Sequence, residues 1–325
     1  MSQLNKILAI VFAIQIAIVG FVFWSQTATT QTATDPLIAD FEPNEVVGLV
    51  ISDGEGNSIH LQKEGETWLL ASADGYPVQG EKVLPVLEKI PNLTRNRLVA
   101  KTDTSHNRLQ VGAADFNRLL ELTLADGTGH KLYLGSSGGV GATHVRTDDQ
   151  VEVYLSGEIN PFEVNAQPSN WVDTVYFTVP QSATQQIKLE NSNGTFQFDR
   201  VDDETWAMSD LAGDELFNQV GVTTMFNQLS PLRLVKPLGT ENKPEYGLDN
   251  PQATVTIEAD EPYTMLVGNL TPDEQGYYLK ASNSPYYVQV AKFTGDNLIN
   301  KVRTDFLETP PAEEAPVGPL VPTGE

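Results

Sequence analysis

Apolar and polar residues alternate along much of the chain, which is the pattern of half-buried strands in an antiparallel sheet. The stretch SIHLQKE (58–64) places Ile59 and Leu61 on one face and polar residues on the other. The stretch TFQFDR (195–200) repeats this arrangement with its two phenylalanines. Turn-forming residues, DGEGN and NSNG, precede the two stretches. Each stretch is therefore predicted to be the second strand of a hairpin.

A helical period interrupts the strand pattern twice. Apolar residues recur at i, i+4 and i+7 in two segments, as Val83, Leu87 and Ile90 and as Val222, Phe226 and Leu229. This spacing predicts two amphipathic helices. Pro91 and Pro231 follow the two segments and are expected to mark the helix ends.

Five short blocks occur twice in the same order. Glu66, Thr67, Trp68 and Gly75 return 138 positions later as Glu204, Thr205, Trp206 and Gly213. The other matched blocks include RLV at 97–99 and 233–235, LTLAD (122–126) with VTIEAD (255–260), and LYLG (132–135) with MLVG (265–268). Chance does not produce such an ordered series, so we infer a tandem duplication.

The predicted fold class is α+β, with two tandem copies of a mainly antiparallel sheet and about one main helix in each. The copies are placed at residues 46–158 and 184–306, with a connector at 159–183. Trp171 in the connector and Phe306 at the end of the second copy are interpreted as buried scaffold.

An apolar run, ILAIVFAIQIAIVGFVFW (7–24), precedes both copies. As a helix it would rise about 27 Å, close to the roughly 30 Å of bilayer hydrocarbon. Lys6 lies before the run, and the next basic residue is Lys63. The positive-inside rule therefore places residues 1–6 in the cytoplasm and the body outside. A cleaved signal peptide is the alternative, but its apolar core is shorter.

Small residues form a stripe within the apolar run, at Ala9, Ala13, Ala17 and Gly20. Such a stripe allows another membrane helix to approach closely, although alanine is also common in membrane helices of every kind. Residues 25–45 are interpreted as a flexible spacer and residues 307–325 as a disordered, acidic, proline-rich tail.

Composition narrows the classes of function. The formal net charge is -23, from 43 acidic and 20 basic residues. So acidic a surface repels phosphate backbones, which argues against nucleic acid as a partner. The chain has no cysteine, which excludes disulfides, thiolate metal sites and cysteine nucleophiles.

No motif of catalytic or metal-binding spacing is present. The histidines, at 60, 106, 130 and 144, lack the spacing of a zinc site. The segment GSSGGVGATH (135–144) lacks the ending of a phosphate loop and is interpreted as a flexible hairpin loop. The DGEGN turn lacks the distant glutamate of a calcium loop. We therefore predict no catalytic residue, cofactor or metal.

Tyrosines gather in the second copy. Two pairs, Tyr277 with Tyr278 and Tyr286 with Tyr287, fall on adjacent predicted strands, so one tyrosine of each pair points to each face. One face is a candidate partner surface, and core packing with hydroxyls at the rim is the alternative.

Several of these stretches resemble a known bacterial family. The ETW strand, SHNRLQVGAADFNRLLELTL (105–124), KPEYGLDNPQATVTI (243–257) and YYLKASNSPYYVQV (277–290) are similar to the family named domain of unknown function 4340. The likeness covers roughly residues 46–306. Members of that family are often encoded beside the permease of a gliding-motility-type ABC transporter, so the resemblance implies an envelope protein associated with such a transporter.

The leading hypothesis is a single-pass, non-enzymatic accessory or scaffold protein of an ABC-type transport complex. It would be anchored in the lipid bilayer of the bacterial cytoplasmic membrane beside a permease, with its body on the periplasmic side. A free-standing envelope module that binds a polymer or peptide is the alternative. A hydrolase is a third possibility, although no set of nucleophile, base and orienting group is visible.

Overall fold

The computed structural model describes Gln15 and residues 35–308. The described residues divide into two compact units. Unit 1 contains residues 35–63 and 80–166, and unit 2 contains residues 64–79 and 167–308. The segment 64–79, which carries the first ETW motif, thus groups with unit 2.

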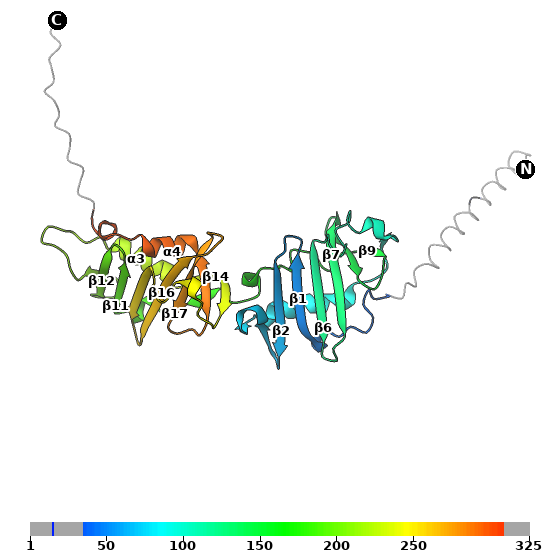
Figure 1. Ribbon diagram of the computed structural model, residues 1–325, viewed down its shortest axis with the longest axis horizontal. Coiled ribbons are helices and arrows are strands. Elements are labelled where there is room, and N and C mark those ends of the chain that lie inside the picture. Colours follow the sequence, from blue (N-terminus) through cyan, green and yellow to red (C-terminus); the bar gives the residue numbers. More distant parts are fainter. Residues whose placement is uncertain (1–14, 16–34, 309–325) are drawn as a thin grey trace, which may run out of the picture. The chain divides into compact units, whose positions relative to one another are not determined.

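The first antiparallel sheet has nine strands in the order β4-β3-β2-β1-β6-β7-β8-β9-β5 (Figure 1). Its strands are β1 (Val46–Asp53), β2 (Ser58–Glu64), β3 (Thr67–Leu70), β4 (Tyr76–Pro77), β5 (Leu98–Ala100), β6 (Arg118–Leu124), β7 (Gly129–Gly139), β8 (Ala142–Thr147) and β9 (Val153–Ser156). The main helix of unit 1, α2 (Gly80–Lys89), lies across one face of these strands.

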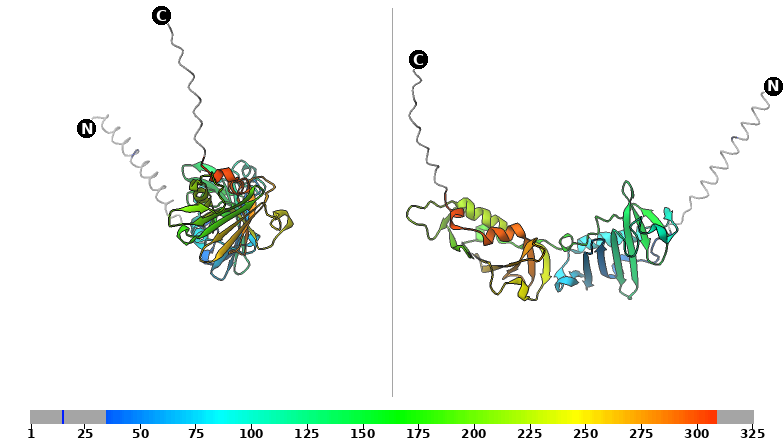
Figure 2. Two further views of the ribbon diagram at one scale, coloured as in Figure 1. Left: turned by 90° about the vertical axis from the view of Figure 1, so that its left-hand side faces the viewer. Right: turned by 45° about the horizontal axis from the view of Figure 1, so that its top comes forward.

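The second sheet also has nine antiparallel strands, in the order β10-β14-β18-β17-β16-β15-β11-β12-β13. Its strands are β10 (Val175–Phe177), β11 (Gln186–Asn191), β12 (Gly194–Arg200), β13 (Trp206–Met208), β14 (Leu232–Gly239), β15 (Ala253–Glu258), β16 (Pro262–Leu270), β17 (Gly276–Ala281) and β18 (Tyr287–Ala291). Two helices, α3 (Gln219–Leu229) and α4 (Lys292–Ile299), lie on one face of it (Figure 2).

The two sheets share one topology. Without the edge strands β4 and β10, the orders are β3-β2-β1-β6-β7-β8-β9-β5 and β13-β12-β11-β15-β16-β17-β18-β14. In each, the first three strands form a meander, a helix follows, and the fourth strand pairs at the opposite edge. The prediction of two mainly antiparallel sheets with few helices is confirmed, and both sheets have the connectivity that a duplicated sequence should give. The described residues are mostly β, however, and the second sheet carries two helices where about one main helix was predicted.

The predicted alternation decides which side chains form the cores. Ile59 and Leu61 are buried in β2, and Phe196 and Phe198 are buried in β12. The tryptophans of the two ETW strands, Trp68 and Trp206, are buried as well. A fully buried Ile, Leu or Phe side chain contributes about 1.5–3 kcal/mol to the stability of the fold through the apolar area that it removes from water.

The two helices predicted from the spacing of apolar residues are both present, as α2 and α3. The predicted residues of the first helix are all buried: Val83 and Leu87 in α2, and Ile90 in the 3₁₀ turn that follows. In the second, the Asn218 side chain caps α3 by accepting a hydrogen bond from the backbone N–H of Val220. Such a cap satisfies one of the free N–H groups at a helix start.

Residues 35–45, predicted to be part of a flexible spacer, are instead packed on unit 1. Leu37, Ile38 and Phe41 are buried, and the Leu37 backbone N–H donates to the Leu93 carbonyl over 2.7 Å. Three apolar side chains in a short segment provide enough buried area to hold it against the body.

The glycine-rich segment 135–144 also differs from its prediction as a flexible loop. β7 continues through Gly139 and pairs with β8, so only residues 140 and 141 form the turn. A Cβ at Gly135 would lie 2.1 Å from the Leu109 carbonyl oxygen, and one at Gly138 would lie 2.1 Å from Leu155 Cδ1. The contact at Gly135 is with a backbone atom, so glycine is needed at that position for close packing of a strand.

Four predictions fall wholly or mostly on residues outside the described part of the chain. They are the cytoplasmic segment at 1–6, the membrane anchor at 7–24, of which only Gln15 is described, the first part of the spacer (25–34), and the acidic tail from residue 309. The first two residues of the predicted disordered tail are instead ordered, because Leu307 forms a β-bridge with Phe217 and the Glu308 backbone N–H donates to the Leu216 carbonyl. Within the described residues, no helix is both long enough and apolar enough to span a membrane. Trp171 and Phe306, interpreted as scaffold, are both buried, and Trp171 belongs to unit 2.

Candidate functional site

A cavity of about 450 Å³ opens in unit 1 beside the glycine-rich hairpin of β7 and β8. Its size lies within the roughly 300–1,000 Å³ of small-ligand pockets. Its lining comes from three separate segments: Gln110 and Asn117, then Gly135, Ser136, Ser137, Gly141, Ala142 and Thr143, and then Asn160, Pro161 and Phe162. None of these lining residues carries a formal charge.

The hairpin forms a fixed wall of this cavity. The Ser136 backbone N–H donates to the Leu109 carbonyl over 2.9 Å, and the Ser136 hydroxyl reaches the same oxygen at 3.2 Å. The close approach at Gly135 brings the two segments together. The wall is therefore positioned by backbone contacts before any ligand arrives.

Ser136 and His144 lie side by side without forming a nucleophile and base. His144 Nδ1 is 2.8 Å from the Ser136 carbonyl oxygen and 3.2 Å from Ser136 Oγ. A carbonyl only accepts hydrogen bonds, so Nδ1 carries the proton and has no lone pair to remove one from the hydroxyl. The Ser136 hydroxyl donates instead to the Leu109 carbonyl. This geometry positions the hairpin and does not activate the serine.

A second part of the cavity lining is the loop that carries Phe162. Ile159 and Val164 are buried on either side of it, and the Asn160 side-chain oxygen accepts from the Phe162 backbone N–H over 3.0 Å. The Asn160 backbone N–H donates to Glu163. The loop is thus held at both ends while Phe162 remains 89% exposed.

Two charged side chains that follow lining residues in the chain, Arg118 after Asn117 and Glu163 after Phe162, are engaged by the protein itself. The Arg118 guanidinium donates to the carbonyls of Val164 and Asn117, at 3.1 and 2.7 Å. Glu163 forms an ion pair with Lys89 of α2. Burial would raise the pKa of Glu163, but the hydrogen bonds from Lys89 and the Asn160 backbone outweigh it and hold that pKa below its ordinary value. The cavity therefore offers hydrogen-bonding groups without net charge.

The predicted tyrosine surface divides into buried and half-buried members. Tyr277 and Tyr278 are buried, whereas Tyr286 and Tyr287 are half-buried. The Tyr277 hydroxyl donates to Asp296 of α4 over 2.7 Å, and burial together with this bond raises the pKa of Tyr277 to about 12. Core packing thus describes the first pair, and a partner role for the second pair stays a prediction.

The contacts described here for Tyr278, Tyr286 and Tyr287 lie within unit 2. Tyr278 stacks on Tyr246 with ring centroids 4.4 Å apart, and Tyr287 lies 5.7 Å from the same ring. The Tyr286 hydroxyl donates to the Gly75 carbonyl at 3.0 Å. These rings mainly pack against one another.

The DGEGN turn is closed by its own side chains. Asp53 Oδ1 accepts from the backbone N–H groups of Glu55 and Asn57, and Oδ2 accepts from the Asn57 side chain. Burial would raise the pKa of Asp53, but these hydrogen bonds outweigh it and lower that pKa. No group of three or more potential metal ligands gathers anywhere in residues 35–308.

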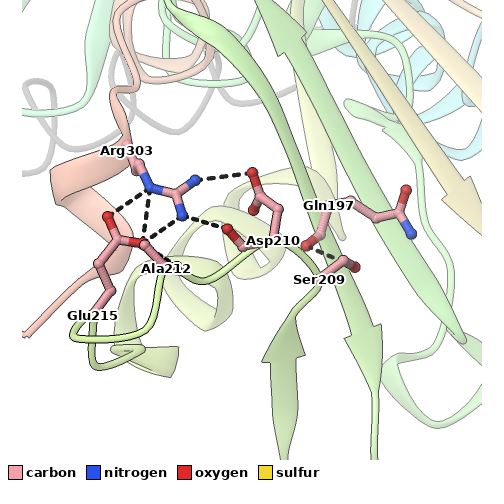
Figure 3. Close-up of polar contacts among 6 residues, drawn as sticks. All are labelled: Gln197, Ser209, Asp210, Ala212, Glu215 and Arg303. Carbon is pink, nitrogen blue, oxygen red and sulfur yellow. Dashed lines mark hydrogen bonds and ion pairs between the residues drawn. The ribbon is translucent and has the colours of Figure 1, made fainter.

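A cluster of ionic contacts in unit 2 was not predicted from the sequence (Figure 3). Arg303 Nε lies 2.9 Å from Glu215 Oε1, and Arg303 Nη1 lies 2.9 Å from Asp210 Oδ2. The hydrogen bond from Arg303 lowers the pKa of Glu215 to about 2. The guanidinium is occupied on several sides, so this cluster holds the 210–215 loop to the 3₁₀ helix at Arg303–Phe306.

The remaining predicted site residues, Ala9, Ala13, Ala17 and Gly20, lie outside the described residues. Sequence reasoning missed the cavity residues Gln110, Asn117, Asn160 and Phe162. The available signal was the Asn-Pro pair at 160–161, which marks a turn and here precedes a phenylalanine.

Comparison with known proteins assigns a family but no activity. No curated protein and no solved structure matches the chain. The family model described as "Domain of unknown function (DUF4340)" matches residues 68–244 and 217–317, well over half of the sequence. The chain therefore belongs to the DUF4340 family.

Proposed function

We propose that this chain is a membrane-anchored, non-enzymatic accessory or scaffold protein of an ABC-type transport complex, with its body on the periplasmic side of a bacterial cytoplasmic membrane. The observation that carries the binding role is the uncharged cavity, in which the hydroxyl of Ser136 and the imidazole of His144 are both engaged by backbone carbonyls. Such a site can hold a ligand but lacks an activated nucleophile.

The membrane part of the proposal is supported by the sequence. The apolar run at 7–24 is long enough to span a bilayer, and Lys6 on one side, with no Lys or Arg on the other side before Lys63, favours an outward orientation of the body. The transporter part is supported by the resemblance described above. Docking beside a permease would use the stripe of Ala9, Ala13, Ala17 and Gly20.

Co-purification in mild detergent tests this function. An affinity tag on the full-length chain should recover an integral-membrane permease. Ala13→Leu should reduce that recovery several-fold because a larger side chain prevents close helix approach. Val11→Leu is the matched control, since position 11 falls about 160° from Ala13 around a helix. Recovery of the chain alone would contradict the transporter role.

A free-standing binding module for a polymer or peptide is the second candidate, and the cavity in unit 1 favours it equally. The two candidates differ in their need for a membrane partner, so the same co-purification separates them. A hydrolase is the weakest candidate because of the Ser136 and His144 hydrogen bonds.

A further inference from the structure

The side-chain amides around the unit 1 cavity keep their donors available. The Asn160 oxygen accepts from the Phe162 backbone, and the Asn117 oxygen accepts from Arg118 at 3.2 Å. These bonds fix which end of each amide is oxygen, so the NH₂ groups are left to donate. Within residues 35–308, neither NH₂ group and no atom of the Gln110 side chain has a protein partner. The cavity thus presents directional groups that water satisfies until a ligand replaces it.

An aromatic ring completes the cavity. Phe162 is 89% exposed although its loop is fixed on both sides, so the protein gains little from burying this ring. An exposed aromatic ring held in place beside polar groups offers a flat apolar surface to a ligand that also needs hydrogen bonds. Immobilised surroundings lower the entropy lost when a ligand binds.

From this arrangement we propose that the cavity binds a neutral saccharide unit of a glycan, with one apolar sugar face against Phe162 and its hydroxyls bonded to Gln110, Asn117 and Asn160. Sugar hydroxyls both donate and accept, which suits amide and hydroxyl partners. An anionic ligand would find no cationic side chain among the lining residues, and the net charge of -23 would oppose it.

A peptide is less well suited to this cavity. Peptides that add to a sheet need an unpaired strand edge. The lining part of β7 lies beyond Leu134, where its pairing with β6 ends, but there β7 still pairs with β8, the Ser136 backbone N–H donates to the Leu109 carbonyl, and the Ser136 carbonyl accepts from His144. The available groups belong instead to side chains, which is the arrangement expected for recognition of separate hydroxyls.

The inference rests on the proposed binding role and names the ligand class of that site. The test is isothermal titration calorimetry on the full-length chain, kept in a detergent without a sugar headgroup. The probes are chitotetraose, maltotetraose and cellotetraose, with pentaalanine as the peptide probe. We expect at least one oligosaccharide to bind and Phe162→Ala to weaken that binding about tenfold or more.

Phe293→Ala is the matched control. Phe293 is also an exposed phenylalanine, at 68%, but lies on α4 in unit 2, so its removal should leave the affinity unchanged. Binding of none of the three sugars, equal binding by Phe162→Ala, or binding of pentaalanine alone would each overturn the inference. Sugar binding without a co-purifying permease would contradict only the transporter role. A co-purifying permease without sugar binding would contradict only the saccharide site.

Discussion

Replacing Gly135 by alanine should open the cavity wall and destabilise the centre of the first sheet. The added Cβ would lie 2.1 Å from the Leu109 carbonyl oxygen and 2.7 Å from Val111 Cγ1. Real Cβ contacts essentially never fall below 3.0 Å, so the two segments must separate by about 0.9 Å. The first of these contacts is with a backbone atom, which has little freedom to move aside.

The cost follows from what that separation disrupts. Two hydrogen bonds from Ser136 to the Leu109 carbonyl would be lost or stretched, at about 0.5–1.5 kcal/mol each. Overpacking of a core adds about 1–3 kcal/mol. The total of about 2–6 kcal/mol is a large part of the roughly 5–15 kcal/mol that stabilises a typical domain.

Hydrogen exchange followed by mass spectrometry measures this effect locally. Amides of β7 and β8 in Gly135→Ala should exchange at least about 30-fold faster than in the parent chain, since each 1.4 kcal/mol is a factor of ten. Gly129→Ala is the control in the same strand, because the nearest atom to its Cβ would be 3.9 Å away. Unchanged exchange in Gly135→Ala would show that this wall is not packed as described.

Two further predictions concern unit 2. The pKa of Glu215 falls from 4.5 to about 2 on folding, so its contribution to stability is full above about pH 4.5 and is lost as the pH falls toward 2. The protection of the 210–215 loop amides, measured relative to their intrinsic exchange rate at each pH, should therefore fall in this pH window, and Arg303→Gln should remove this pH dependence. The same loss of protection in both proteins would refute the assignment. Tyr277→Phe removes the hydroxyl that donates to Asp296 and should cost about 0.5–3 kcal/mol. Urea titration checks this, with Tyr263→Phe, at an exposed contact, as the near-neutral control, and equal midpoints for both variants would contradict it.

The sequence determines the elements of this fold more clearly than their order in the sheets. The alternation in β2 and β12 predicts strands because one face of each must be buried. When β4 and β10 are left out of the count, the fourth strand of each copy pairs with the eighth at the far edge of the sheet. These pairs are β5 with β9 in the first sheet and β14 with β18 in the second. Periodicity describes only neighbours along the chain, so this long-range pairing could not be predicted from it.

The candidate site was harder to predict for two physical reasons. Glycine suits both flexible loops and tightly packed strands, and only the neighbours at Gly135 and Gly138 distinguish these uses. The polar residues of the cavity also come from segments around 110–117, 135–143 and 160–162, with no fixed spacing. Burial of Tyr277 was equally hidden, because tyrosine suits both a core and a surface.

The proposed role of this chain as the partner of a membrane complex is tested most directly by photo-crosslinking in living cells. A benzophenone amino acid is introduced at position 13 of the full-length chain, and in a separate variant at position 11. We expect position 13 to crosslink to an integral-membrane protein and position 11, on the opposite helix face, to yield mainly lipid adducts. No protein adduct at position 13, or equal adducts at both positions, would contradict the proposal.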